Sequence, residues 1–99
     1  MARKLVVRPS ADEDFTAILE FIAEESLDSA IAFIDSIEKR CYSLLDFPEQ
    51  GRARDDLRVG LRVLPFGRSV VIAYQFDAEA VEIMRVFYGG QDYEALMRE

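Results

Sequence analysis

The first half of the chain repeats its apolar residues every three or four positions, which is the period of an amphipathic helix. One stripe comprises Ala11, Phe15, Ile18, Leu19 and Ile22, and a second comprises Ala30, Phe33, Ile34, Ile37, Cys41, Leu44 and Leu45. The stripes predict helices over roughly 10–25 and 28–46. Ser10 to Glu13 matches a capping box, and Pro48 cannot continue a helix. Because the break between them is short, we expect an antiparallel helical hairpin.

The second half follows the period of a strand. From Leu57 to Leu64, apolar residues alternate with Arg58, Gly60 and Arg62, which predicts a half-buried strand with both Arg on one face. Further apolar runs predict strands over 5–7, 70–76 and 80–88, with a turn at Pro65-Phe66-Gly67 and a short tail or helical turn over 91–99.

This order of elements, β-α-α-β-β-β, predicts an α+β fold in a single domain that spans 1–99. We expect an antiparallel sheet that the first strand completes. The helical hairpin should cover one face of the sheet. The other face should stay partly open, and Arg58, Arg62 and Arg85 should point from it.

Composition excludes several classes of site. The chain has no His and one Cys, so it offers no zinc ligand set and neither a Ser-His nor a Cys-His nucleophile pair. No apolar run reaches the roughly 20 residues of a membrane span. We therefore expect a cytoplasmic protein with no metal site and no membrane partner.

The formal net charge is −7, which argues against direct binding of nucleic acid. The charge is uneven, however. Residues 52–68 contain five Arg and only two acidic residues. Arg suits bidentate recognition of carboxylate or phosphate, although a solvated loop would explain the same residues.

An ordered set of short motifs runs through nearly the whole chain. It comprises Pro9-x-Ala11-x-x-Asp14-Phe15, Ile22-Ala23, Phe47-Pro48-x-x-Gly51-Arg52, Leu57-Arg58-x-Gly60-Leu61-Arg62-x-Leu64-Pro65, Gly67-Arg68, Val71-Ile72-x-Tyr74 and Ile83-x-Arg85-Val86-x-x-Gly89. The set resembles the RelE/ParE superfamily of toxins and is most similar to the ParE branch. The resemblance implies a toxin that inhibits DNA gyrase by protein–protein binding, without a catalytic centre or a cofactor. It also implies a hetero-oligomer with a ParD-like antitoxin.

RelE-like relatives instead cleave messenger RNA on the ribosome, using basic side chains and a C-terminal Tyr or His. The resemblance would assign that role here to Arg58, Arg62, Arg85 and Tyr88. However, Val71 stands where RelE has an Arg, and Tyr88 and Gln91 replace the His and Arg of the C-terminal family motif. These departures favour the ParE interpretation. A ribonuclease and a non-toxic relative that only binds an antitoxin remain the alternatives.

The resemblance and the pattern together indicate two sets of binding residues. The antitoxin is expected to contact Leu19, Phe21, Leu27, Ile31, Arg58, Arg62 and Arg68. The target is expected to contact Arg62, Arg85, Tyr88, Gln91 and Tyr93. A structural ion pair of Arg85 with Glu82 or Asp92 is the competing interpretation of that residue, and we expect the carboxylates of Asp12 to Asp14 to be solvated.

Overall fold

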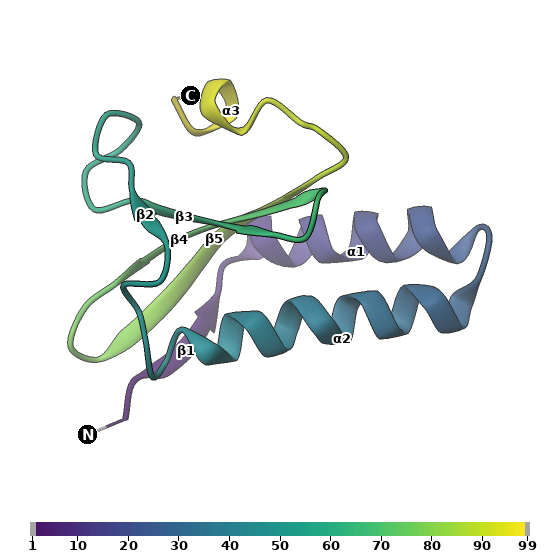
Figure 1. Ribbon diagram of the computed structural model, residues 1–99, viewed down its shortest axis with the longest axis horizontal. Coiled ribbons are helices and arrows are strands. Elements are labelled where there is room, and N and C mark those ends of the chain that lie inside the picture. The colour runs from purple at the N-terminus through teal and green to yellow at the C-terminus, as the bar shows by residue number, and fades with distance from the viewer. Residues whose placement is uncertain (1, 99) are drawn as a thin grey trace.

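A five-stranded sheet lies between two layers of helices in the computed structural model, which describes residues 2–98 (Figure 1). The elements in chain order are β1 (Lys4–Val7), α1 (Pro9–Ala23), α2 (Leu27–Ser43), β2 (Arg52–Ala53), β3 (Arg62–Phe66), β4 (Val70–Phe76), β5 (Ala80–Tyr88) and α3 (Tyr93–Arg98). The predicted α+β fold is confirmed. The two predicted long helices are present, although each ends two or three residues earlier than expected.

The strands are arranged in the order β1-β5-β4-β3-β2. The first strand does complete the sheet, but it runs parallel to β5, whereas the other pairs are antiparallel. The sheet is therefore mixed, because the chain leaves β1 for the helices and returns to its side only in β5. The two-residue strand β2 was not predicted.

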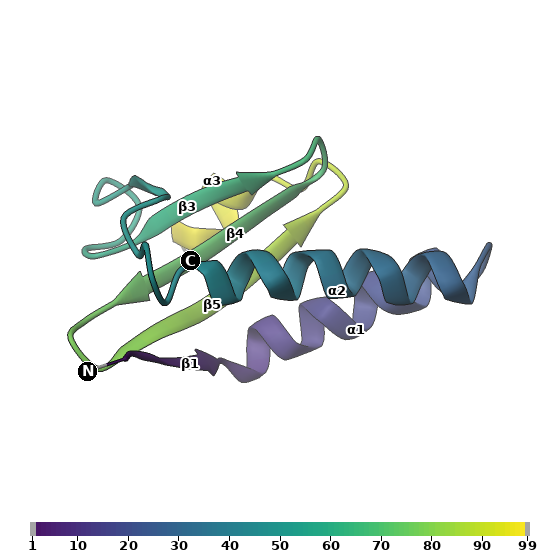
Figure 2. The same cartoon turned by 60° about the horizontal axis from the view of Figure 1, so that its bottom comes forward.

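The helical hairpin covers one face of the sheet and makes the larger core. Ile37 and Leu44 from the second helical segment meet Ile72 and Ile83 of the central strands, and all four are fully buried. Burial of each such side chain contributes about 1.5–3 kcal/mol. The hairpin extends past the end of the sheet, so its tip has no strand beneath it (Figure 2).

The start of α1 differs from the prediction. Pro9 begins the helix, and Arg8 at the N-cap position supplies no side-chain hydrogen bond. The capping box does not form, because Ser10 lies inside the first turn and its hydroxyl donates to the carbonyl of Met84 at 2.8 Å. Proline is favoured at this first helical position, since its missing N–H has no partner there.

The predicted strand over 57–64 is wrong in its first half. Residues 55–60 form a turn, closed by the hydrogen bond from the Arg54 N–H to the Leu61 carbonyl at 2.8 Å. The Asp55 carboxylate accepts the Gly60 N–H at 2.8 Å, and Gly60 has a φ of +82°, which favours glycine. The apolar alternation arises because Leu57 and Leu61 fold back onto the sheet, where both are buried.

The second face of the sheet is not open, contrary to the prediction. The turn and α3 cover it and form a smaller core of buried residues, namely Leu57, Leu61, Val63, Ala73, Met84, Phe87 and Met97. Figure 1 shows α3 on the side of the sheet opposite the hairpin. The helical turn expected in the tail is therefore present as α3. It covers the face of the sheet on which the sequence predicted exposed arginines.

Candidate functional site

The arginines that were expected on one face of the sheet are divided between its two faces. Arg62 is the cross-strand partner of Tyr74, which packs in the core under the hairpin. Its guanidinium donates to the Gly51 carbonyl at 2.7 Å and lies over the Phe76 ring at 5.7 Å. The expectation failed because Arg58 belongs to the turn rather than to the strand of Arg62.

Arg58 and Arg85 do come together, on the α3 side. With Arg8 they line a cavity of about 220 Å³ that also contains Ser10, Met84, Leu96 and Met97. Arg8 forms an ion pair with Glu82 at 3.0 Å, and this contact lowers the pKa of the Glu82 carboxyl. Sequence reasoning missed Arg8, which lies just before the first helix.

Arg85 pairs with neither Glu82 nor Asp92. A register shift opposite Ala73 leaves Met84 as an extra residue in β5, and such a bulge redirects side chains. The Arg85 guanidinium donates to the two carboxylate oxygens of Asp14 at 2.8 and 3.0 Å. The Asp14 side chain is only 15% exposed, so the expectation that it is solvated is also wrong.

Arg54 anchors α3. It donates to Asp56 at 2.9 Å, to Glu94 at 2.6 Å and to the Tyr93 hydroxyl at 3.1 Å. The hydrogen bonds to Asp56 and Glu94 raise the pKa of Arg54, and Arg54 lowers the pKa of Asp56 to about 2. Tyr93, expected to contact the target, also packs on Phe87 at 6.0 Å between ring centroids.

Tyr88 points to the hairpin side of the sheet. Its ring meets Phe21 at 6.0 Å and Phe33 at 5.7 Å, both edge to face. The Gln91 side-chain oxygen accepts the Tyr88 N–H at 3.0 Å, so the residue that replaces the family arginine closes the turn after β5. Of the four residues expected for a nuclease, two therefore lie on each side of the sheet, Arg58 with Arg85 and Arg62 with Tyr88.

Three of the apolar residues expected to bind an antitoxin are exposed. Phe21 is 63% exposed, Leu27 59% and Ile31 49%, and all three belong to the half of the hairpin nearest its tip. Leu19 is half-buried, and Arg68 is exposed in the turn between β3 and β4. We call Phe21, Leu27 and Ile31 the tip surface.

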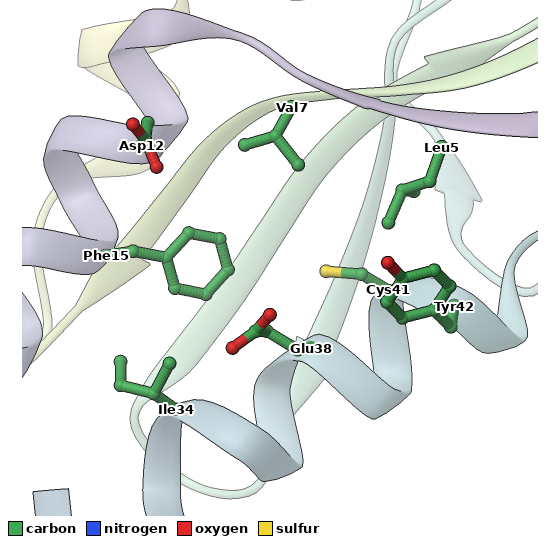
Figure 3. Close-up of a pocket in the computed structure, with 8 residues that line it drawn as sticks. All are labelled: Leu5, Val7, Asp12, Phe15, Ile34, Glu38, Cys41 and Tyr42. Atoms are coloured by element: carbon green, nitrogen blue, oxygen red, sulfur yellow. The ribbon is translucent and has the colours of Figure 1, made fainter. Parts of the chain in front are cut away.

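The other end of the hairpin has a cavity of about 190 Å³ between α1, α2 and β1. Figure 3 shows the Phe15 ring and the Cys41 sulfur pointing into it, with the Glu38 carboxylate nearby. Burial, and to a smaller degree Glu38, raises the pKa of the Cys41 thiol to about 12. The prediction that Cys41 is a buried residue of the helical stripe is confirmed.

Residues 2–98 hold neither a cluster of metal-ligand side chains nor a membrane-spanning helix. Within this range no three acidic or Cys side chains are grouped so as to hold a metal ion. None of the helices described here has both the length and the apolar character needed to cross a membrane.

The comparisons with known proteins point to one family. The family model described as "ParE toxin of type II toxin-antitoxin system, parDE" matches residues 5–93. A solved structure described as "Chromosomal ParDE TA system from P. aeruginosa" superposes with a TM-score of 0.74 at 19% identity, over 88% of this chain and 96% of the other. That likeness shows the fold. Among curated proteins, no sequence matches this chain.

Proposed function

The chain belongs to the family of ParE toxins of type II toxin–antitoxin systems, and from this membership we propose how it acts. It inhibits DNA gyrase by protein–protein contact in the cytoplasm. A ParD-like antitoxin neutralises it in a hetero-oligomeric complex. The contacts with the antitoxin run over the hairpin and the exposed arginines, and those with gyrase involve Arg62, Arg85, Tyr88, Gln91 and Tyr93.

The observation that carries antitoxin binding is the tip surface. Three large apolar side chains are exposed on one end of the hairpin, which extends beyond the sheet. Amphipathic segments bind such surfaces by placing their own apolar residues against them. The exposed Arg58 and Arg68 can meet acidic residues of the same partner, which would set association rate and register more than affinity.

The division of the basic residues supports inhibition by binding over RNA cleavage. A phosphate under attack needs its stabilising groups in one place. Here Arg62 is directed to the Gly51 carbonyl, while Arg85 is paired with Asp14 on the other side of the sheet. Val71, which stands in the place of a RelE arginine, packs against the smaller core.

The decisive experiment adds the purified chain to DNA gyrase and measures supercoiling and trapped cleavage complexes. We expect loss of supercoiling, and we expect the product of the reading frame adjacent to this one to restore it when added first. If the chain arrests growth but leaves gyrase unaffected, gyrase is not its target. Unimpaired growth on expression without the partner would instead indicate a relative that only binds an antitoxin.

The cavity lined by Arg8, Arg58 and Arg85 makes a ribonuclease the second candidate, because it brings three arginines together, although the guanidinium groups of Arg8 and Arg85 are paired with Glu82 and Asp14. Programmed ribosomes incubated with the chain test this candidate directly. Cuts in the messenger at the A site that disappear in Arg58→Ala would establish it. Intact messenger, together with inhibited gyrase, would exclude it.

A further inference from the structure

A second cavity of the hairpin, of about 380 Å³, lies near its tip. Three aromatic rings from three elements line it: Phe21 from α1, Phe33 from α2 and Tyr88 from β5. The Tyr88 ring makes edge-to-face contacts with both phenylalanines, at interplanar angles of 62° and 67°. Such contacts hold rings in a defined arrangement. The site is therefore assembled by the fold rather than by one helix alone.

Two carboxylates belong to the same cavity. Glu24 and Glu25 line it, together with Ile22, Ser26 and Ser29, and both glutamates are exposed. The wider surroundings have the same sign, because residues 12–38 contain nine acidic residues and no Lys or Arg. The rest of the chain carries a net charge of +2. The negative charge of the protein is thus concentrated on the hairpin that holds this cavity.

We propose that this cavity binds the side chain of a Lys or Arg residue that the antitoxin supplies. Aromatic faces attract cations through the ring quadrupole, and carboxylates bind them through charge-assisted hydrogen bonds. The aliphatic part of the side chain would lie against Phe21, Phe33 and Ile22. A purely apolar side chain would make no charge-assisted contact with Glu24 and Glu25, and an acidic one would be repelled by them.

The assignment to the antitoxin rests on the proposed function and on continuity of the surface. Phe21 belongs both to the tip surface and to the wall of the cavity. Leu27 and Ile31 lie on the opposite flank of α2 from Ser29 and Phe33, so Phe21 is the residue through which a segment bound at the tip reaches the cavity. It follows that the antitoxin presents two kinds of charge, a basic side chain to the hairpin and acidic side chains to the arginines of the turns.

The cavity itself can be tested with the full chain and small probes. N-acetyl-arginine amide and its uncharged counterpart N-acetyl-norleucine amide are titrated while the NMR signals of Phe33 and Tyr88 are followed. We expect the arginine probe to bind about fivefold more tightly than the norleucine probe. Equal binding of the two would overturn a cation site.

The occupant is tested with the product of the adjacent reading frame. Glu24→Gln with Glu25→Gln is compared with Glu20→Gln with Asp35→Asn, which changes net charge equally on exposed hairpin residues outside this cavity. We expect the first pair to weaken the complex about fivefold and the second pair to weaken it less than twofold. Equal losses, or no loss in either pair, would overturn the proposal. Absence of any complex with the unmodified chain would refute the proposed function instead, and the probe titration would still report on the cavity.

Discussion

Asp14 in α1 and Arg85 in β5 form a bidentate ion pair, with hydrogen bonds of 2.8 and 3.0 Å. The same carboxylate also accepts the Val86 N–H at 2.8 Å. Since β1 ends opposite Ile83, this part of the β5 edge has no strand beside it. Side chains of α1 take the place of that strand, because Ser10 likewise donates to the Met84 carbonyl.

Asp14→Ala should lower the free energy of unfolding by about 2–3 kcal/mol, because it removes the carboxylate that binds both the half-buried Arg85 guanidinium and the Val86 N–H. Urea denaturation followed by circular dichroism measures the change. Glu13→Ala, at an exposed neighbouring position, is the control and should stay within about 0.5 kcal/mol. Equal losses in the two variants would show that Asp14 acts only through the charge of the helix.

The Tyr74 hydroxyl ties the loop after α2 to the sheet. It donates to the Pro48 carbonyl at 2.7 Å and accepts the Gly51 N–H at 2.8 Å, and Tyr74 is fully buried. Tyr74→Phe should therefore cost about 1–3 kcal/mol, since both backbone groups lose their partner. The control is Tyr42→Phe, at a ring that is 57% exposed, which should be neutral by thermal denaturation. A neutral Tyr74→Phe would mean that the loop finds other partners.

Gly51 is constrained by the same hydroxyl. A Cβ at this position would lie 2.6 Å from the Tyr74 hydroxyl oxygen and 2.9 Å from the Val63 carbonyl oxygen, so one of them must move. We expect Gly51→Ala to destabilise the chain by about 1–3 kcal/mol through overpacking. Gly67→Ala cannot serve as the control, because the φ of +61° at Gly67 would strain the backbone of any substituted residue. Unchanged thermal stability of Gly51→Ala would show that the loop shifts without cost.

The buried thiol of Cys41 makes stability depend on pH in the alkaline range. Its pKa is about 12 in the folded chain and about 9 when exposed, so the stabilisation is complete below pH 9 and is lost as pH rises towards 12. Over that interval the slope relative to Cys41→Ala should approach about 1.4 kcal/mol per pH unit. Urea denaturation at several pH values compares the two chains. If the free energies of unfolding of the two chains changed with pH in the same way, the Cys41 thiol would not stay protonated in the folded chain over this range.

The elements that the sequence predicted well are those with a long, regular period. The apolar stripe through Ile18 and the stripe through Ile37 identify the hairpin, because each repeats one pattern over about four turns of helix. The alternation from Leu57 was misleading for a physical reason. A turn that folds back onto a sheet buries the same residues as a strand would.

The candidate site was harder to predict because it depends on contacts across the fold. Asp14 and Arg85 are 71 positions apart, and nothing in the local pattern joins them. The bulge at Met84 interrupts the alternation along β5, so a strict period of two misplaces the side chains around it. The exposure of side chains at the hairpin tip was easier to predict from the sequence, because Phe21 and Leu27 lie outside the apolar stripes.

Antitoxin binding should depend on the tip surface and not on exposed apolar residues elsewhere. Ile31→Ser removes a side chain that is 49% exposed on the hairpin, and we expect it to weaken the complex about tenfold, because burial of such anchors supplies most affinity. Val59→Ser, at a turn residue that is 85% exposed, should leave the affinity unchanged. Isothermal titration calorimetry with the product of the adjacent reading frame measures both. The reverse ranking would move the antitoxin from the hairpin to the turn over the smaller core.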